Sequence, residues 1–122
     1  MNIYISLNNI NYFRKIYNNI ILRINNTLKD NNLTFRRKYQ EILGCTFEEL
    51  ETYIIEKLKP GMTLENYGEW EIDHIMPISS FDFDMYNDKL NNNINRCFHY
   101  TNLQPLWLLE NREKSNKIYY DF

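Results

Sequence analysis

Apolar side chains recur along residues 9–29 at the three- and four-residue intervals of an amphipathic helix. The polar run at 30–32 interrupts this pattern and predicts a loop. We expect the apolar face of the helix to pack on the core, although the same face would also suit a homodimer contact. That face carries Ile10, Phe13, Ile16, Tyr17, Ile20, Ile21, Ile24 and Leu28.

Two shorter helices are predicted next in the chain. Residues 35–43 have helical spacing and are followed by Gly44, a residue type that commonly ends helices. Thr46 and Glu49 have the spacing of a capping box, in which each side chain bonds the other residue's backbone N–H. A helix over about 47–58 therefore follows, and the Pro-Gly pair after it stops the helix.

Residues 69–76 change to the two-residue alternation of a short strand, which Pro77 ends. Residues 103–108 form a second apolar run, and Pro105 within it indicates an edge strand or a bulge. We expect a short helix or loop over the Asn-rich segment 82–96 and a terminal helix over 109–117.

The order of elements indicates an α+β fold, a small and mainly helical domain with its strands late in the chain. With 122 residues the chain has the length of one domain. Within this single domain, 1–122, we expect a helical N-terminal segment over 1–59, a candidate DNA-binding or dimer surface. The remaining segment is 60–122.

Composition changes how the asparagines are interpreted. The chain has 19 Asn and neither Ala nor Val, a bias typical of an AT-rich genome, so an Asn is informative only in context. No run of 18 apolar residues and no secretory signal is present, so we expect an intracellular protein that neither enters nor spans a membrane. Cys45 and Cys97 are isolated, and we expect two buried free thiols.

Charge is unevenly distributed although the net charge is only −2. Residues 1–45 carry +5, residues 46–90 carry −8, and residues 91–122 carry +1. An acidic centre suits cation binding and basic flanks suit phosphate groups. For most of the glutamates, solvated helix faces are the preferred explanation.

The acidic centre contains the pair Asp73-His74, and two asparagines, Asn102 and Asn111, follow downstream. A neutral imidazole, with an unperturbed pKa of about 6.5, can deprotonate a water near neutral pH. One Mg²⁺ ion needs only one or two protein oxygen ligands and can act as a Lewis acid on a phosphodiester. Adjacent strand positions face opposite sides, so one member of the pair would face a metal and the other a water.

These residues resemble the HNH (His-Me finger, ββα-metal) endonuclease family in its His-Asn-Asn form, as found in phages, large DNA viruses and mobile elements. The resemblance covers about residues 35–118. It rests on the motifs Leu43-Gly-Cys-Thr, Gly61-Met-Thr-Leu-Glu-Asn-Tyr-Gly68, Ile72-Asp-His-Ile-Met-Pro77, Tyr100-Thr-Asn-Leu-Gln-Pro-Leu-Trp107 and Glu110-Asn-Arg-Glu-Lys114-Ser.

The resemblance implies a role for each residue of the pattern. His74 would be the general base, Asp73 and Asn111 the metal ligands, and Asn102 the residue that holds the loop and orients His74. Residues 60–122 would form the ββα-metal catalytic core. Asn116 competes with Asn111 as the last ligand. Because many relatives place a histidine there and this chain does not, we expect Mg²⁺ or Mn²⁺ rather than Zn²⁺.

The function implied is a metal-dependent DNA endonuclease that leaves 5′-phosphate and 3′-hydroxyl ends. One site cuts one strand, so double-strand cleavage requires a homodimer or two successive nicks by a monomer. The alternatives are a catalytically idle DNA-binding module of a larger complex and a helical interaction protein. Candidate DNA contacts are Arg112, Lys114 and Lys117 beside Asn111, and His99, which would otherwise pack under the site. Arg36 and Arg37 form a second candidate basic patch, which a solvated helix face explains equally well.

Overall fold

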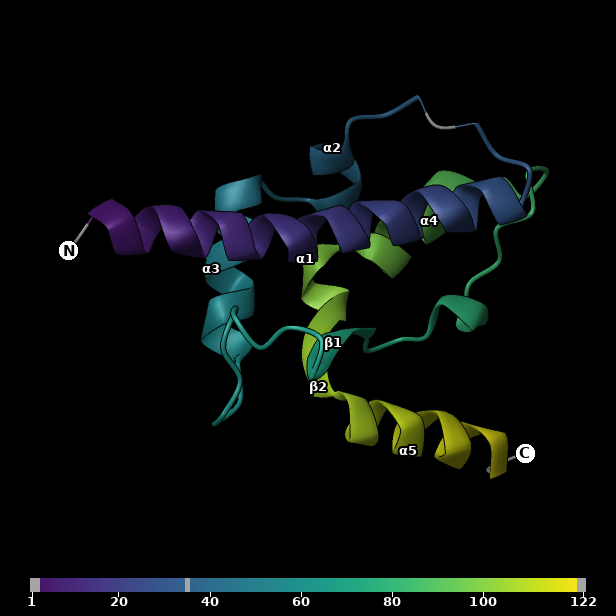
Figure 1. The fold of residues 1–122 in the computed structure, drawn as a ribbon. Coiled ribbons are helices and arrows are strands. Elements are labelled where there is room, and N and C mark those ends of the chain that lie inside the picture. The colour runs from purple at the N-terminus through teal and green to yellow at the C-terminus, as the bar shows by residue number, and fades with distance from the viewer. Residues whose placement is uncertain (1–2, 35, 121–122) are drawn as a thin grey trace.

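A computed structural model describes the backbone of residues 3–34 and 36–120 and the side chains of residues 12–34 and 36–114. The fold is α+β and mainly helical, with one two-stranded antiparallel sheet (Figure 1). In chain order the elements are α1 (Ile3–Asp30), α2 (Tyr39–Leu43), α3 (Phe47–Lys57), β1 (Trp70–His74), a 3-10 turn (Ile78–Ser80), α4 (Leu90–Phe98), a second 3-10 turn (Tyr100–Asn102), β2 (Leu103–Trp107) and α5 (Leu108–Tyr120).

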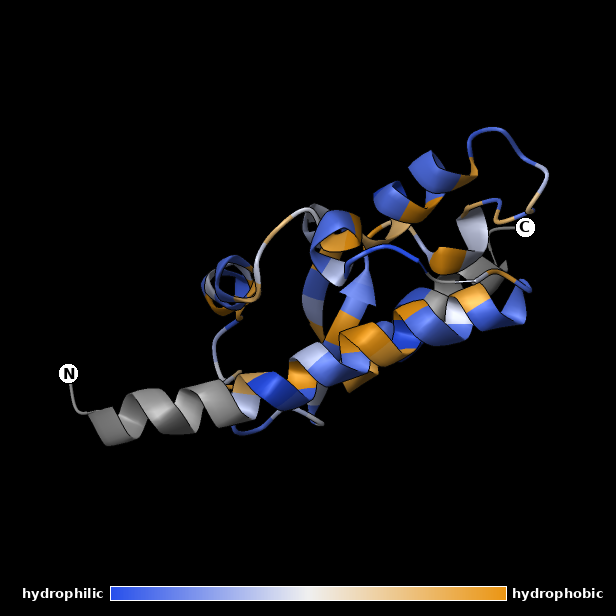
Figure 2. Ribbon diagram, turned by 90° about the horizontal axis from the view of Figure 1, so that it is seen from above, coloured by the Kyte–Doolittle hydropathy of each residue, from blue (hydrophilic) through white to orange (hydrophobic). Residues whose placement is uncertain are grey.

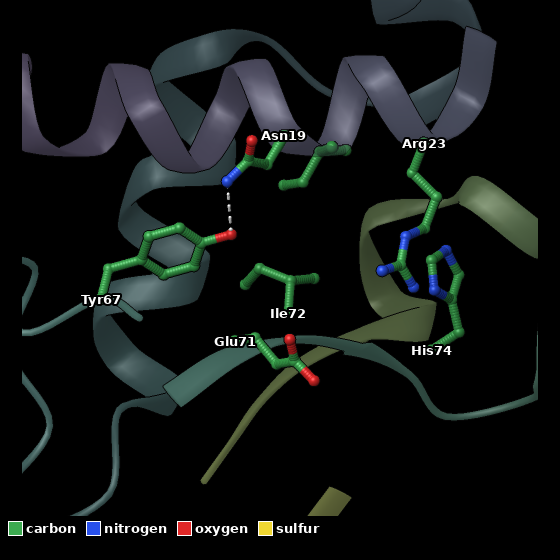
Figure 3. A pocket seen from close by; sticks show the side chains of 7 residues that line it. Asn19, Arg23, Tyr67, Glu71, Ile72 and His74 are labelled. Atoms are coloured by element: carbon green, nitrogen blue, oxygen red, sulfur yellow. Dashed lines mark hydrogen bonds between the residues drawn. The ribbon is translucent and has the colours of Figure 1, made fainter. Parts of the chain in front are cut away.

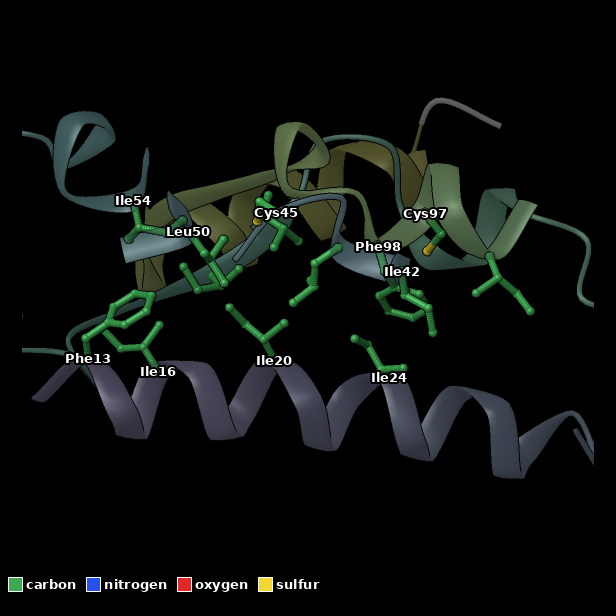
Figure 4. Packing of buried hydrophobic residues seen from close by; sticks show 14 of the residues in the cluster. Phe13, Ile16, Ile20, Ile24, Ile42, Cys45, Leu50, Ile54, Cys97 and Phe98 are labelled. Atoms are coloured by element: carbon green, nitrogen blue, oxygen red, sulfur yellow. The ribbon is translucent and has the colours of Figure 1, made fainter. Parts of the chain in front are cut away.

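Helix α1 contains the predicted segment and extends it at both ends. Along the part of α1 that is coloured in Figure 2, hydrophobic and hydrophilic residues alternate turn by turn. Five side chains of the predicted face, Phe13, Ile16, Ile20, Ile24 and Leu28, are buried in the core (Figure 4). Tyr17 and Ile21 are partly buried against it, so the core-packing alternative for this face is confirmed. The side chain of Ile10 lies outside the described residues.

Helix α2 is shorter than predicted, because Lys38 has an extended backbone (φ −70°, ψ 143°) and the helix begins only at Tyr39. Its last residue is Leu43, and Gly44 follows as the predicted helix stop, with a left-handed backbone (φ 75°). The capping box that opens α3 is confirmed. The Glu49 N–H donates to Thr46 Oγ1 and the Thr46 N–H donates to Glu49 Oε1, both at 3.1 Å.

Strand β1 begins one residue later than the predicted segment 69–76 and ends two residues earlier, at His74. It pairs with β2, so each strand has one free edge, which is where Pro105 is tolerated. The strand pair lies between α1 and α5 (Figure 1). In the segment 82–96, the first residues form a loop and the rest belong to α4. The terminal helix is confirmed as α5, somewhat longer than predicted.

One buried cluster joins side chains from the helical N-terminal segment and from residues 60–122 (Figure 4). It includes Phe13 and Leu50 from the N-terminal segment and Trp70 and Phe98 from residues 60–122, all fully buried. Cys45 and Cys97 are buried free thiols, as predicted, and burial raises their pKa values to about 11 and about 12. Within residues 3–34 and 36–120, no helix has the length and apolar character needed to cross a membrane.

Candidate active site at the end of the strand pair

The candidate site lies on the strand pair and the first turns of α5. In the antiparallel register Asp73 is opposite Gln104 and His74 is opposite Leu103. Asp73 and Glu71 form hydrogen bonds with α5, whereas Ile72 and His74 face α1 (Figure 3). The neighbouring residues Asp73 and His74 therefore point to opposite sides of the strand, as expected from strand alternation. Glu71 lies at the edge of the strand and also lines the cavity on the α1 side.

The Asp73 carboxylate lies at the centre of a polar cluster on the α5 side. Its Oδ2 accepts hydrogen bonds from Gln104 Nε2 at 2.9 Å and from Lys114 Nζ at 2.6 Å. The Lys114 ammonium also donates to the backbone carbonyl of His74 at 2.7 Å. The Asp73 side chain is 12% exposed and that of Lys114 is 28% exposed, so this ion pair is partly shielded from water. Two oxygens of β1 thus hold one cation.

Asn111 reaches the same face of β1 but contacts a different carboxylate. Its Nδ2 donates a hydrogen bond to Glu71 Oε1. This contact leaves the carbonyl oxygen of Asn111 without a hydrogen-bond partner among the described residues. The two residues assigned to a metal by the resemblance, Asp73 and Asn111, are thus brought to one face, with Glu71 beside them. The side chain of Asn116 lies outside the described residues.

Asn102 connects three backbone segments at the end of the strand pair. Its Oδ1 accepts from the Met76 N–H at 2.8 Å, and its Nδ2 donates to the carbonyls of Met76 and Cys97 at 3.1 and 2.8 Å. The Asn102 backbone carbonyl also accepts from the Ile75 N–H at 2.8 Å. Asn102 is 9% exposed, so these bonds form largely out of water. The segment that follows His74 is therefore fixed to the end of α4.

His74 is 6% exposed and packs edge-on against Phe98, with ring centroids 5.4 Å apart. Its Nε2 is buried without a hydrogen-bond partner in the described region of the chain. Burial lowers the pKa of His74 to about 4, and the positive charge of Arg23 adds to this shift. The negative charge of Asp73 opposes the shift, and the positive charge of Lys114 lowers the pKa further. The imidazole is therefore neutral at pH 7 and can accept a proton.

A cavity of about 40 Å³ separates His74 from α1 (Figure 3). Its walls come from Asn19, Ile20 and Arg23 of α1, from Tyr67, and from β1. The Asn19 amide donates to the Tyr67 hydroxyl at 2.9 Å across one side. Because a water needs roughly 10–15 Å³ of such space, the cavity has room for a small number of water molecules beside the imidazole.

His99 lies near Asn102 but does not line the cavity beside His74. Its Nδ1 forms a 2.7 Å hydrogen bond with the Thr101 hydroxyl, and its ring lies against Tyr100. The opposite ring edge covers Gly44, where an added Cβ would be 2.5 Å from His99 Nε2. Half-buried in this way, His99 closes the end of α2 and also lines an open groove of about 480 Å³ that includes Asn102.

The predicted DNA contacts do not form one patch. Arg112 is exposed on α5, and Lys114 is engaged with Asp73. The side chain of Lys117 lies outside the described residues. Arg36 and Arg37 line a separate groove between the segment before α2 and the start of α4, and that groove shares no lining residue with the cavity beside His74.

Three residues of the site were not expected from the sequence. Glu71 is two positions before Asp73, so strand alternation alone indicates that both carboxylates share a face. Gln104 acquires its role only through the strand register. Arg23 carries no local signal, because its position beside His74 follows from the packing of α1 on the sheet.

No family model matches the chain, and no solved structure matches it. The chain is 33% identical over 85 residues to the uncharacterized protein L426 of Acanthamoeba polyphaga mimivirus, an alignment that covers 69% of this chain. It is 32% identical over 69 residues to the uncharacterized protein L246 of the same virus, covering 55% of this chain. The chain spans about a third of the length of these curated relatives, 35% and 28% respectively.

Proposed function

We propose that this protein is a metal-dependent DNA endonuclease of the HNH (His-Me finger, ββα-metal) type. The observation that carries the proposal is the arrangement of β1, β2 and α5. Two antiparallel strands followed by a helix bring Asp73 and Asn111 to one face and leave His74 at the end of the strand. The similarity to two mimivirus proteins agrees with a viral or mobile-element origin for such an enzyme.

The oxygen donors fit a hard divalent cation. The Lys114 ammonium already binds the Asp73 carboxylate and the His74 carbonyl, so the oxygens at this position favour a cation. The carbonyl oxygen of Asn111 and the carboxylate of Glu71 lie on the same face. Within the described residues no three His, Cys, Asp or Glu side chains come together. Asp73 and Asn111 would hold Mg²⁺ or Mn²⁺.

In the proposed reaction, the neutral imidazole of His74 accepts a proton from a water in the adjoining cavity. Asn102 keeps the segment after His74 in place, which maintains the direction of the ring. When bound, the metal supplies Lewis-acid stabilisation of the charge on the phosphate and on the departing 3′ oxygen.

The opposite orientations of Asp73 and His74 suit this chemistry. An in-line displacement at phosphorus has its nucleophile and its leaving group on opposite sides. Because His74 is the last residue of β1, a phosphate at the end of the strand would have the base on the α1 side and the metal ligands on the α5 side. Cleavage with departure of the 3′ oxygen leaves 5′-phosphate and 3′-hydroxyl ends.

One observation favours a second function, a catalytically idle DNA-binding module of a larger complex. Lys114 occupies the Asp73 carboxylate at 2.6 Å, and a site that kept this ion pair permanently would not bind a metal. The two functions differ in one measurable respect. The module binds DNA without cutting it in Mg²⁺ or Mn²⁺.

The test is incubation of supercoiled plasmid with Mg²⁺, Mn²⁺, Zn²⁺ or EDTA, for the wild type and for His74→Ala. A general base contributes roughly 10²–10⁴ in rate, so we expect nicking in Mg²⁺ or Mn²⁺ and no visible nicking by the variant. Thermal unfolding by circular dichroism confirms that the variant is folded. Equal nicking by both proteins would overturn the role of His74, and cleavage with Zn²⁺ alone would overturn the metal assignment.

A further inference from the structure

Arg23 is the basic residue that α1 brings to the cavity beside His74 (Figure 3). Its side chain is exposed, and its guanidinium lies alongside the imidazole ring. No carboxylate among the described residues forms an ion pair with it. A cation without a partner next to a buried imidazole indicates a place for an anion.

Two further observations support an anion at this position. The His74 ring lines this cavity, and its Nε2 is buried without a partner among the described residues, whereas buried polar atoms are normally paired. The cavity also continues into an open groove of about 400 Å³ along α1. That groove shares Asn19, Arg23, Tyr67 and Glu71 with the cavity, so an extended ligand can approach His74 from solvent.

We propose that Arg23 binds a backbone phosphate of the DNA strand beside His74, so that α1 forms one wall of the substrate site. An arginine fork matches the oxygens of a phosphate and forms paired, charge-assisted hydrogen bonds with it. Asn26 and Thr27, further along the groove, supply an amide and a hydroxyl for neighbouring phosphate or sugar oxygens. This inference rests on the proposed nuclease function and assigns a substrate contact to it.

Acidic residues confine this contact to a short stretch. Glu71 and Asp30 line the same groove and repel phosphates. The Asn111 amide engages one Glu71 oxygen, whereas Asp30 lies at the far end of α1. We therefore expect the DNA strand to contact the protein at Arg23 and not along the whole groove.

The experiment compares Arg23→Gln with Lys15→Gln, which removes the same charge from an exposed position on the same helix. Binding of a short fluorescein-labelled DNA duplex is followed by anisotropy in EDTA over a range of salt concentrations. We expect Arg23→Gln to weaken binding about tenfold, and the salt slope to fall by about one. Arg23→Lys keeps the charge but loses the paired N–H donors of the guanidinium. We expect this variant to keep the wild-type salt slope and to bind DNA with intermediate affinity.

A second measurement separates a phosphate contact from a structural role. Duplexes in which one phosphate at a time is replaced by a neutral methylphosphonate are bound to the wild type and to Arg23→Gln. The wild type should lose affinity at one position that Arg23→Gln no longer distinguishes, whereas Lys15→Gln should keep the wild-type profile. Thermal unfolding by circular dichroism verifies that each variant is folded.

The outcomes distinguish the Arg23 contact from the proposed function. If the wild type cuts DNA while Arg23→Gln matches Lys15→Gln in affinity, salt slope and methylphosphonate profile, the role of Arg23 is wrong and the nuclease stands. If the wild type neither binds nor cuts DNA in any metal, the proposed nuclease function and the proposed Arg23 contact are both wrong.

Discussion

The Lys114 ammonium lies 2.6 Å from Oδ2 of Asp73, so the carboxylate that we propose as a metal ligand is already paired with a positive charge. This ion pair links α5 to β1 and is reinforced by the bond from Lys114 to the His74 carbonyl. A divalent cation at Asp73 would have to displace Lys114, because two cations on one carboxylate oxygen repel each other. Lys114 is then free to contact a phosphate.

Replacing Lys114 by methionine should therefore strengthen metal binding. Losing a competing charge-assisted hydrogen bond is expected to tighten Mn²⁺ binding about tenfold, measured by calorimetric titration in the absence of DNA. Lys59→Met is the matched control. It also removes a lysine from an ion pair that involves α5, because Lys59 pairs with Glu110 at 3.1 Å, but this pair does not include Asp73. Weaker or unchanged Mn²⁺ binding in Lys114→Met would contradict the competition.

Asn102→Ala should destabilise the fold by about 2–4 kcal/mol. The substitution leaves the Met76 N–H and the Cys97 carbonyl without their partner in a largely buried position, and each unpaired buried group costs about 1–3 kcal/mol. Urea unfolding followed by tryptophan fluorescence gives the change. Asn92→Ala, on the exposed side of α4, should change stability by less than about 0.5 kcal/mol. Equal effects from the two substitutions would show that Asn102 does not hold this segment.

Gly44→Ala should be destabilising for two separable reasons. A left-handed backbone costs an alanine roughly 1–2 kcal/mol, and the new Cβ would be 2.5 Å from His99 Nε2. In the double variant Gly44→Ala/His99→Ala the clash is absent but the backbone cost remains. We therefore expect the effect of Gly44→Ala on the unfolding midpoint to be smaller in a His99→Ala background. An identical effect in both backgrounds would place the whole cost in the backbone.

Stability should depend on His74 between pH 6.5 and pH 4. In the unfolded chain His74 has an ordinary pKa of about 6.5, whereas burial lowers its pKa to about 4 in the folded protein. Between these values the unfolded state binds more protons, so the free energy of unfolding falls as the pH falls. The contribution of neutral His74 is complete above pH 6.5 and is lost by about pH 4, a change of about 3 kcal/mol.

The pH measurement compares the wild type with His74→Gln in EDTA. Carboxylates titrate in both proteins, so the difference between their urea midpoints isolates the histidine. We expect the wild type to lose more stability than His74→Gln on going from pH 7 to pH 4. Parallel curves would mean that His74 keeps an ordinary pKa in the folded protein.

Local patterns were sufficient to predict most of the elements. The helical spacing of α1, the capping box at Thr46 and the alternation around Ile72 each depend on interactions within a few residues of the chain. Such patterns placed element ends less well. The start of α2 was predicted too early because nothing local to residues 36–38 announces the extended backbone at Lys38.

The sequence alone also indicated that Asp73 and His74 would point to opposite faces, because strand geometry forces neighbouring side chains apart. Only the tertiary structure decided which groups each one meets. Lys114 on Asp73, Asn111 on Glu71 and Arg23 beside His74 join residues from separate elements, and their meeting depends on how α1 and α5 pack on the strand pair. Local residue spacing carries the periodicity of an element, but the contacts between distant elements follow from packing, and it is packing that sets the charge around the site.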